Sequence, residues 1–404
     1  MRERVKSFAF VRIGGFSGLN DGLLGELRLQ FPDLAADVID ILDFRAVTRS
    51  DAARLLYAVA HDYGAAACLT RSRVESRVIR TAYCFRKIRK LLLQRLSQKK
   101  YAFTLQTQSL VNASLPGTPH FLYTDHTHLA NLTYPGQRLT PMASAEWLAL
   151  ERAMYHDARL NFTMSAHVSR SLIDQYGCHP ARVECVYAGS NVTPGDAANR
   201  GLERFARKNI LFVGIDWERK GGPVLLEAFR QVRRAHPDAT LTIVGSAPKV
   251  SMPGCHVVGR VPLAQVARFY EAASVFCLPT TVEPFGVVFL EAFAHGLPVI
   301  ATNIGAIPDF VENGRSGYMV DPNDAAQLAL RLNDLLADPA RCAAFGSCGN
   351  ALVDARYTWS ATARRLAFHI NRCAGMNACP GQSSKLSSPA AAEAAAPCAL
   401  PDAY

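Results

Sequence analysis

Two glutamates, Glu283 and Glu291, stand eight residues apart in the stretch TTVEPFGVVFLEAFAHGLPVIAT, with an almost wholly apolar run between them. The run has helical spacing, and a helix that begins near Phe285 and Gly286 would leave its first amides without intrahelical partners. Glu283 would then lie just ahead of this helix, with Glu291 about two turns inside it. A carboxylate that accepts two hydroxyl bonds can bind the diol of a ribose or hexose. The spacing alone fits equally a Glu283 that caps the helix and a Glu291 that makes a surface ion pair.

A second candidate for ligand chemistry is ILFVGIDWERKGGPVLLEAF, whose pattern predicts a strand, a turn and a helix. Gly214 follows the strand, and Lys220 stands just before a helix that starts near Pro223, a residue suited to the first helical turn. Free amides at a helix N-terminus beside a lysine form a cradle for phosphate, to which Arg219 could add a second cation. A solvated surface turn is the alternative for this stretch taken alone.

The first half of the chain offers weaker signals. In FLYTDHTHLANLTYP, Asp125, His126 and His128 follow an expected strand, where they fit either a metal-ligand set or a polar strand end. In RIGGFSG, Gly14 and Gly15 would let the backbone approach a ligand closely, although a plain turn explains them nearly as well.

Residues 71–100 hold eleven Lys and Arg and one Glu, and their pattern predicts an amphipathic helix. The apolar stripe comprises Val78, Ala82, Phe85, Ile88, Leu92 and Leu96, with Arg80, Arg86, Lys87 and Lys90 largely opposite. We expect this helix to pack on the first sheet with a solvated basic face. The sharper hypothesis is contact with anionic lipid headgroups or an anionic acceptor. Nucleic acid is disfavoured, because no recognition motif accompanies the charge.

The elements that must position these residues are apolar, β-prone runs, each followed by a helical stretch. This alternation predicts parallel sheets with crossover helices, hence an α/β fold of two doubly wound, Rossmann-like domains that face each other across a cleft. Ligands would bind at the carboxyl ends of the strands. We expect an N-terminal, acceptor-side domain at 1–190, a polar linker at 191–208 and a C-terminal domain at 209–373. The final helix of the C-terminal domain would return toward the first domain, and residues 374–404 would form a disordered tail.

Composition bounds the class of protein. The 404 residues are 49% hydrophobic and 19% charged with a net charge of +10, which suits a globular protein with anionic partners. The Met-Arg-Glu-Arg start lacks a signal-peptide core, and no apolar run reaches the roughly 18 residues of a membrane-spanning helix. The eleven cysteines are scattered without a CxxC pair, as in reduced thiols. These features predict a cytoplasmic protein, and the basic segment adds the alternative of one peripheral to the inner face of the membrane.

The stretch PTTVEPFGVVFLEAFAHGLPVIATNIGAIPDFV resembles the E-x7-E signature of the family 4 retaining glycosyltransferases, which have the GT-B fold. FVGIDWERKGGPVLLEAF is similar to the phosphate-binding loop of this family. PDATLTIVGSAP, CHVVGRVPLAQVARFYEAASVFCLPT and ENGRSGYMVDPND fit in order and distance. The resemblance covers roughly 250 residues and is looser in the first half.

The resemblance implies a role for each matched position. Glu291 would bind the ribose hydroxyls of a donor nucleotide sugar. Glu283 would hold the donor sugar and distal phosphate together with the amides of Phe285, Gly286 and Val287. Lys220, with Arg219 as a weaker partner, would neutralise the diphosphate. The remaining donor-side positions would be Gly14, Gly15, Gly214 and the backbone near Arg260 and Val261.

On the same resemblance, His126 is the candidate catalytic residue of the first domain. Two positions depart from the family pattern, since Ile215 stands where many relatives carry Arg, and Asn191 stands where an aspartate is common. The chain contains no Asp-x-Asp motif of the metal-dependent GT-A type, so we expect no metal and no other cofactor.

The predicted activity is transfer of a sugar from a nucleotide-diphosphate sugar to a saccharide, a lipid-linked saccharide or a small molecule, with retention of configuration. A role in polysaccharide biosynthesis would follow the habit of the family. The alternatives are another GT-B enzyme, such as a nucleotide-sugar epimerase or a phosphorylase, and a non-catalytic sugar-nucleotide-binding module.

Overall fold

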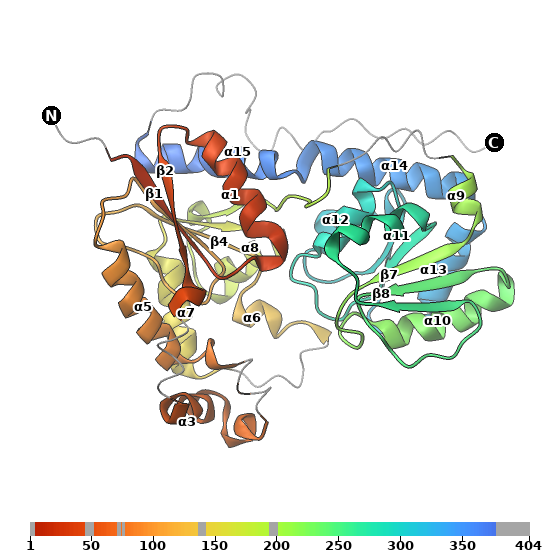
Figure 1. The fold of residues 1–404 in the computed structure, drawn as a ribbon, viewed down its shortest axis with the longest axis horizontal. Helices are drawn as coiled ribbons and strands as arrows, with labels where there is room; N and C mark the ends of the chain where they lie inside the picture. Colours follow the sequence, from red (N-terminus) through yellow and green to blue (C-terminus); the bar gives the residue numbers. More distant parts are fainter. Residues whose placement is uncertain are drawn as a thin grey trace. The chain divides into compact units, whose positions relative to one another are not determined.

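The computed structural model describes residues 5–44, 52–70, 74, 77–135, 143–193 and 201–376. These residues divide into two compact units. Unit 1 holds the described residues up to 133, residues 143–189 and residues 359–376, and unit 2 holds residues 134–135, 190–193 and 201–358. Each unit is built on a parallel six-stranded sheet with helices on both faces, which confirms the predicted α/β class (Figure 1).

The sheet of unit 1 has the strand order β2-β1-β3-β4-β5-β6. Its strands are β1 (Ser7–Arg12), β2 (Ala35–Asp40), β3 (Thr104–Thr107), β4 (His120–Thr124), β5 (Leu160–Thr163) and β6 (Val183–Cys185). Phe8, Ala9, Phe10 and Val11 are all buried, as expected for a strand covered on both faces. The chain reverses its direction of travel across the sheet between β1 and β3, so a crevice for ligands is expected at their carboxyl ends.

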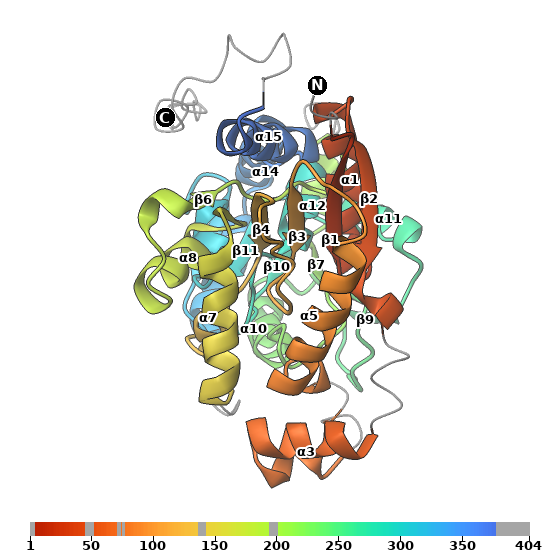
Figure 2. The same ribbon diagram turned by 90° about the vertical axis from the view of Figure 1, so that its left-hand side faces the viewer.

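The helices of unit 1 cover the two faces of this sheet, except for α3 (Ala52–Tyr63), which lies away from the sheet (Figures 1 and 2). They are α1 (Leu19–Gln30), α3 (Ala52–Tyr63), α5 (Ala82–Leu96), α6 (His128–Asn131), α7 (Ala145–Asp157), α8 (Ala166–Arg170) and α15 (Trp359–Ala374). The buried residues of α5 pack with β1 and β2, whereas α7 packs with β4. Helices α1 and α15 contact each other on the opposite face.

The amphipathic pattern of the basic segment is confirmed over α5. Its buried residues include Ala82, Phe85, Ile88, Leu92 and Leu96. The helix begins after Thr81, whose hydroxyl accepts a hydrogen bond from the amide of Cys84. The apolar stripe is used in the core, and of the basic side chains Arg86 and Lys90 are exposed, whereas the half-buried Arg89 donates to the carbonyls of Asn112 and Ser114.

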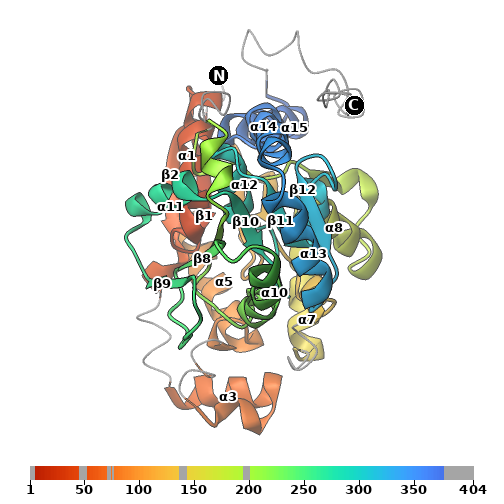
Figure 3. The same cartoon turned by 90° about the vertical axis from the view of Figure 1, so that its right-hand side faces the viewer.

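The sheet of unit 2 has the strand order β12-β11-β10-β7-β8-β9, with all strands parallel (Figure 3). They are β7 (Asn209–Val213), β8 (Thr240–Val244), β9 (Cys255–Gly259), β10 (Val275–Leu278), β11 (Val299–Thr302) and β12 (Gly317–Val320). The chain starts in the middle at β7, runs outward to β9 and resumes at β10 on the other side of β7. The junction of β7 and β10 is therefore the topological switch point of this sheet.

The helices of unit 2 also form two layers (Figures 1 and 3). They are α9 (Glu203–Ala206), α10 (Gly222–Ala235), α11 (Ala267–Ala272), α12 (Val287–Ala294), α13 (Ala325–Leu336) and α14 (Pro339–Arg356). Helices α10 and α13 contact each other on one face, and α12 contacts α14 on the other.

The structure assigns the described residues of the predicted linker, 191–193 and 201–208, to unit 2. Residues 201–208 belong to unit 2, where the buried Arg204 of α9 donates hydrogen bonds to the carbonyls of Ala273, His295 and Tyr270. Its charge suggested a solvated linker, whereas three carbonyl acceptors make its burial favourable. Residues 194–200 of the linker and 377–404 of the tail lie outside the described residues.

Candidate functional site

The junction of β7 and β10 brings together the two signature stretches of the second unit. The loop after β7 contains Gly214 and Lys220, and the loop after β10 contains Glu283. Because β7 and β10 are neighbouring parallel strands, both loops leave the same edge of the sheet at adjacent positions.

Gly221 fixes how closely these two loops approach. Its φ is +76°, and a Cβ built on it would lie 1.9 Å from the carbonyl oxygen of Pro279. The loop is also closed by Trp217, whose ring covers Gly222 at the start of α10 and packs edge-on against Phe212. Only glycine satisfies both the left-handed conformation and the contact at position 221.

This approach places Lys220 against Glu283. The Lys220 ammonium pairs with Oε2 of Glu283, and the two side chains are 11% and 6% exposed. The backbone of Glu283 is held as well, since its carbonyl accepts a hydrogen bond from the buried Tyr134 hydroxyl at 3.1 Å. The pair satisfies two charges that would otherwise be unfavourable at this depth. The structure thus joins two of the predicted site residues in one ion pair.

The amides at the start of α12 form the second part of the site. Gly286 is the N-cap of α12 with a φ of +95°, and no side chain caps the helix. Within the described residues, the structure gives no hydrogen-bond acceptor for the amides of Phe285, Gly286 and Val287. Glu283 points to Lys220 and does not cap the helix, so the capping alternative is wrong. Three unused donors beside a buried lysine suit a negatively charged ligand.

Glu291 lies inside α12 and is 8% exposed. Its Oε2 accepts a hydrogen bond from the Tyr270 hydroxyl at 3.0 Å. Burial raises the pKa of Glu291, and the Tyr270 bond partly offsets this. The alternative of a surface ion pair is therefore wrong, because the carboxylate is buried and its partner is a tyrosine.

The other residues predicted for the donor side lie at different distances from the Lys220–Glu283 pair. The Arg219 guanidinium donates to Oδ2 of Asp216 at 3.2 Å and to the Val282 carbonyl at 2.9 Å, so it braces the two loops together. Ile215 is 69% exposed at the tip of the same loop. The Gly214 carbonyl accepts from the Ser246 hydroxyl, which links the loop to the end of β8.

Arg260 and Val261 follow β9 at the edge of the sheet. Two strand spacings, roughly 10 Å, separate the end of β9 from that of β7. The structure places these residues at the correct edge of the sheet but does not bring them to the Lys220–Glu283 pair. This offset is the one expected for a different portion of an extended ligand.

In unit 1, Gly14 and Gly15 follow β1 at the expected switch point. Gly14 has a φ of +58°, and its amide donates to Oδ1 of Asp40 at 3.0 Å while its carbonyl accepts from the buried Asn20 side chain. A Cβ on Gly15 would meet open space. The turn is thus built by Gly14, and the Gly15 backbone is open to approach.

His126 follows β4 and is tightly held. Its Nδ1 lies 2.6 Å from Oδ1 of Asp125, and its carbonyl accepts from the hydroxyl of Thr124 at 2.8 Å. Both side chains of the Asp125–His126 pair are largely buried. An aspartate at Nδ1 orients the ring so that Nε2 faces away from the pair, which suits a polar or proton-transfer role.

His128 is engaged elsewhere. The Ala143 amide donates to its Nε2 at 3.1 Å, and burial lowers its pKa to about 4. The ligand atoms of Asp125, His126 and His128 do not form a close cluster in the described part of the chain. The metal-ligand alternative for this set therefore has no geometric support.

Sequence reasoning missed Glu151 on α7. This buried carboxylate accepts hydrogen bonds from the His128 amide and from the hydroxyls of Tyr155 and Tyr176, and burial raises its pKa. It ties α7 and the segment after α8 to the loop that carries His126. The only sequence signal was a glutamate among apolar residues of a helix, which also fits an exposed residue.

The two sheets, together with Lys220, Glu283 and the amides of residues 285–287 at the β7–β10 junction, define an α/β protein with the two Rossmann-like units of the GT-B class. Residues 207–338 match the family model described as glycosyl transferases group 1. The chain therefore carries a domain of the glycosyl transferases group 1 family, as its motifs predicted.

Sequence relatives match about half of the chain. The chain is 33% identical over 214 residues to the D-inositol 3-phosphate glycosyltransferase of Segniliparus rotundus, which covers 48% of this chain and 47% of that relative. It is 34% identical over 193 residues to the GDP-mannose-dependent alpha-(1-6)-phosphatidylinositol monomannoside mannosyltransferase of Mycolicibacterium smegmatis, with shares of 43% and 50%. The chain spans about half the length of these relatives.

Solved structures confirm the fold over nearly the whole chain. Sucrose-phosphate synthase of Thermosynechococcus elongatus is similar with a TM-score of 0.66 and 19% identity, over 91% of this chain and 98% of that one. HepE of Anabaena, solved in complex with UDP-glucose, is similar with a TM-score of 0.59 and 17% identity, over 91% and 99%. At these identities the likeness concerns the fold alone.

Proposed function

We propose that this chain is a glycosyltransferase that moves a sugar from a nucleotide-diphosphate sugar to an acceptor, with retention of configuration and without a metal ion. The observation that carries the proposal is the buried Lys220–Glu283 pair beside the unused amides of residues 285–287. The match to the glycosyl transferases group 1 model over residues 207–338 supports it.

The reaction breaks the bond between the sugar C1 and a phosphate oxygen, so negative charge grows on the departing diphosphate. Lys220 and the amides at the start of α12 are fixed donors that stabilise this charge without reorganising. A diphosphate at this position competes with Glu283 for the ammonium of Lys220. The Glu283 carboxylate is then available to accept hydrogen bonds from the sugar hydroxyls.

Glu291 completes the donor site in this proposal. Among the described residues no protein group donates a hydrogen bond to its second oxygen, Oε1, while Tyr270 holds Oε2. A ribose diol donates to Glu291 and so favours its charged form. The names of relatives and neighbours include both GDP-mannose and UDP-glucose as ligands, which makes the base a question for experiment.

Thermal shift with UDP-, GDP- and ADP-sugars is the first test, because a ligand that binds only the folded state raises its stability. We expect one base to stabilise the chain, and the sugar of that donor, isotopically labelled, to reach an acceptor in the presence of EDTA. The anomeric configuration of the product, measured by NMR, tests retention.

Three results would overturn parts of this proposal. Stabilisation without turnover across an acceptor panel would support a binding module, and conversion of the donor without an acceptor would support an epimerase. Loss of transfer in EDTA, restored by a divalent ion, would contradict the metal-independent mechanism.

A further inference from the structure

The first unit contains a basic pocket that the donor site does not use. It has a volume of about 630 Å³ and lies between α3, α5 and the start of α7. We define this α3–α5–α7 pocket by its charged and aromatic lining, which comprises Arg54, Tyr57, His61, Asp62, Tyr83, Arg86, Lys87, Lys90 and Glu146. Four Lys and Arg side chains stand against two carboxylates.

Both carboxylates of the pocket are already engaged. Oδ2 of Asp62 accepts a hydrogen bond from the Ala82 amide at 2.7 Å, so it holds the start of α5. Oδ1 of Asp62 lies 3.1 Å from Nδ1 of His61, and Glu146 pairs with Arg86. Their charges are thus committed to the protein itself.

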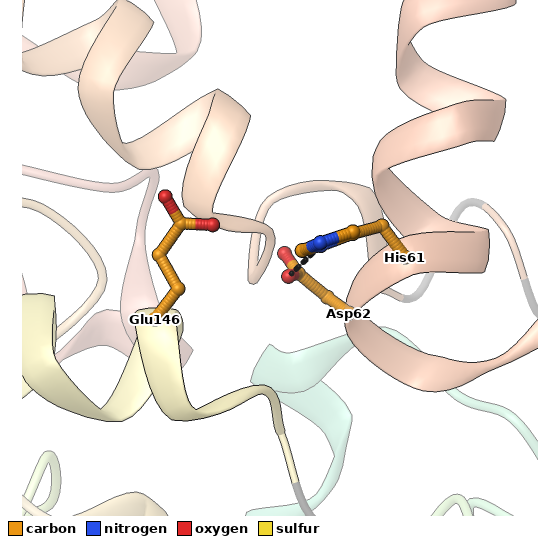
Figure 4. A group of neighbouring side chains, drawn as sticks. All are labelled: His61, Asp62 and Glu146. Carbon is orange, nitrogen blue, oxygen red and sulfur yellow. Dashed lines mark hydrogen bonds and ion pairs between the residues drawn. The ribbon is translucent and has the colours of Figure 1, made fainter.

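The ligand atoms of His61, Asp62 and Glu146 lie within 4.8 Å of one another, which is compact enough to hold a metal ion. Figure 4 shows His61 and Asp62 side by side on one helix, with Glu146 on another. The surrounding charge argues against a cation here, since Arg54, Lys87 and Lys90 line the same cavity. A divalent cation would also compete with Arg86 for Glu146. The same excess of positive charge attracts an anion.

The position of the pocket fits an acceptor. Helices α5 and α7 start at this pocket, and crossover helices start beside the carboxyl ends of parallel strands, where ligands bind. The wall at Glu146 is also linked to the candidate catalytic loop, because the nearby Ala143 amide donates to His128. Tyr57, 72% exposed, offers an aromatic face at the mouth.

We propose that the α3–α5–α7 pocket binds a phosphate group of the acceptor, an inference that rests on the proposed transferase function. Arginine forks and lysine ammonium groups are the side chains that recognise phosphate most strongly. The phosphate belongs either to a soluble phosphorylated compound or to the headgroup of a lipid, and the same residues serve both. Leu56 and Leu69, 45% and 73% exposed, add apolar surface on the α3 side.

The test compares two double variants of the full chain that remove the same charge. Arg54→Gln/Lys90→Gln removes two exposed cations of the pocket, and Arg28→Gln/Lys100→Gln removes two exposed cations elsewhere on unit 1. The donor site is first saturated with the nucleoside diphosphate selected by the donor panel. Glycerol phosphate is then titrated by calorimetry, and flotation is measured with phosphatidylglycerol-containing and pure phosphatidylcholine vesicles.

We expect the wild type and the control variant to bind one of the two phosphate probes, and the pocket variant to bind it at least about tenfold more weakly. Binding of glycerol phosphate would identify a soluble source, and flotation only with phosphatidylglycerol would identify a lipid headgroup. Equal binding by both variants, or no binding of either probe by the wild type, would overturn the proposal that this pocket binds phosphate. Nucleoside diphosphate binding, measured on all three chains, separates such a failure from failure of the donor site.

A metal site is the remaining outcome. Zn²⁺ or Mn²⁺ that stabilises the wild type but not Glu146→Gln would overturn the anion proposal in favour of a cation at His61, Asp62 and Glu146.

Discussion

The two units carry their candidate residues in contrasting ways. In unit 2 the candidates contact one another, since Lys220 pairs with Glu283 and Gly221 lies against Pro279. In unit 1 each candidate is held by a different neighbour, as Gly14 is by Asp40 and His126 by Asp125. For the diphosphate proposed as the ligand of unit 2, closely packed backbone and one ion pair would fix the position of the negative charge. The side proposed for the acceptor instead offers side chains around an open pocket.

The largest expected effect comes from breaking the close approach in unit 2. Gly221→Ala introduces a Cβ at 1.9 Å from the Pro279 carbonyl and a residue with a φ of +76°. We expect loss of donor binding and a decrease in unfolding free energy of about 2–5 kcal/mol, from the left-handed backbone together with overpacking. Chemical denaturation and calorimetry with the donor measure the two effects.

Gly314→Ala is the matched control, because Gly314 has a φ of +79° but no atom near its Cβ position. It should lose only about 1–2 kcal/mol and keep donor binding. Equal effects of the two substitutions would show that backbone conformation matters and the Pro279 contact does not.

The next effect tests the ion pair. Lys220→Met leaves the buried Glu283 carboxylate unpaired, so we expect a stability decrease of about 3–5 kcal/mol and a fall in kcat of about 10²–10³-fold. In Lys220→Met/Glu283→Gln the stability should largely return, because neither charge remains, while turnover stays low. Recovery of turnover in the double variant would show that the pair is structural only.

Two smaller effects concern pH and have opposite signs in the two units. In unit 1, burial lowers the pKa of His128 to about 4 from 6.5. The unfolded chain therefore binds a proton at His128 more readily than the folded chain does. Because of this, the free energy of unfolding decreases as the pH falls from 6.5 through about 4. Relative to His128→Gln, the wild type should lose roughly 1–2 kcal/mol over this interval, measured by urea denaturation at each pH. A constant difference across the interval would contradict the lowered pKa.

In unit 2, burial raises the pKa of Glu291 above 4.5. The folded chain then holds the proton of Glu291 more tightly than the unfolded chain does. The resulting contribution to the free energy of unfolding is fully present below pH 4.5 and is lost as the pH rises through the raised pKa. We expect Glu291→Gln to gain stability relative to the wild type as the pH rises from 4 to 7. Saturating nucleotide sugar should reduce the gain if Glu291 binds the ribose. Thermal unfolding with and without donor measures both, and a gain that is absent at pH 7 would contradict the prediction.

The strands and the donor motifs could be predicted from sequence because their signals are local. Alternating apolar runs and helical stretches predicted the parallel strands and crossover helices of both units, and Gly317–Val320 was recognised only as part of the motif ENGRSGYMVDPND. The roles expected of Lys220 and Glu283 rest on family resemblance. That Lys220 would pair with Glu283, 63 residues away, could not be predicted, because it depends on β7 and β10 lying next to each other.

The site at the β7–β10 junction and the α3–α5–α7 pocket both combine features that the sequence determined with features that only the tertiary structure decided. The sequence by itself determined the α/β class, the family domain at 207–338 and the apolar stripe of α5, since each depends on residue spacing along one segment. The described part of the chain contains no helix long and apolar enough to cross a membrane. Only the tertiary structure decided the partners of the charged residues: Tyr270 for Glu291, the carbonyls around Arg204 and the hydroxyls around Glu151. A buried charge is stable only where distant segments supply its partners, and no local pattern encodes that meeting.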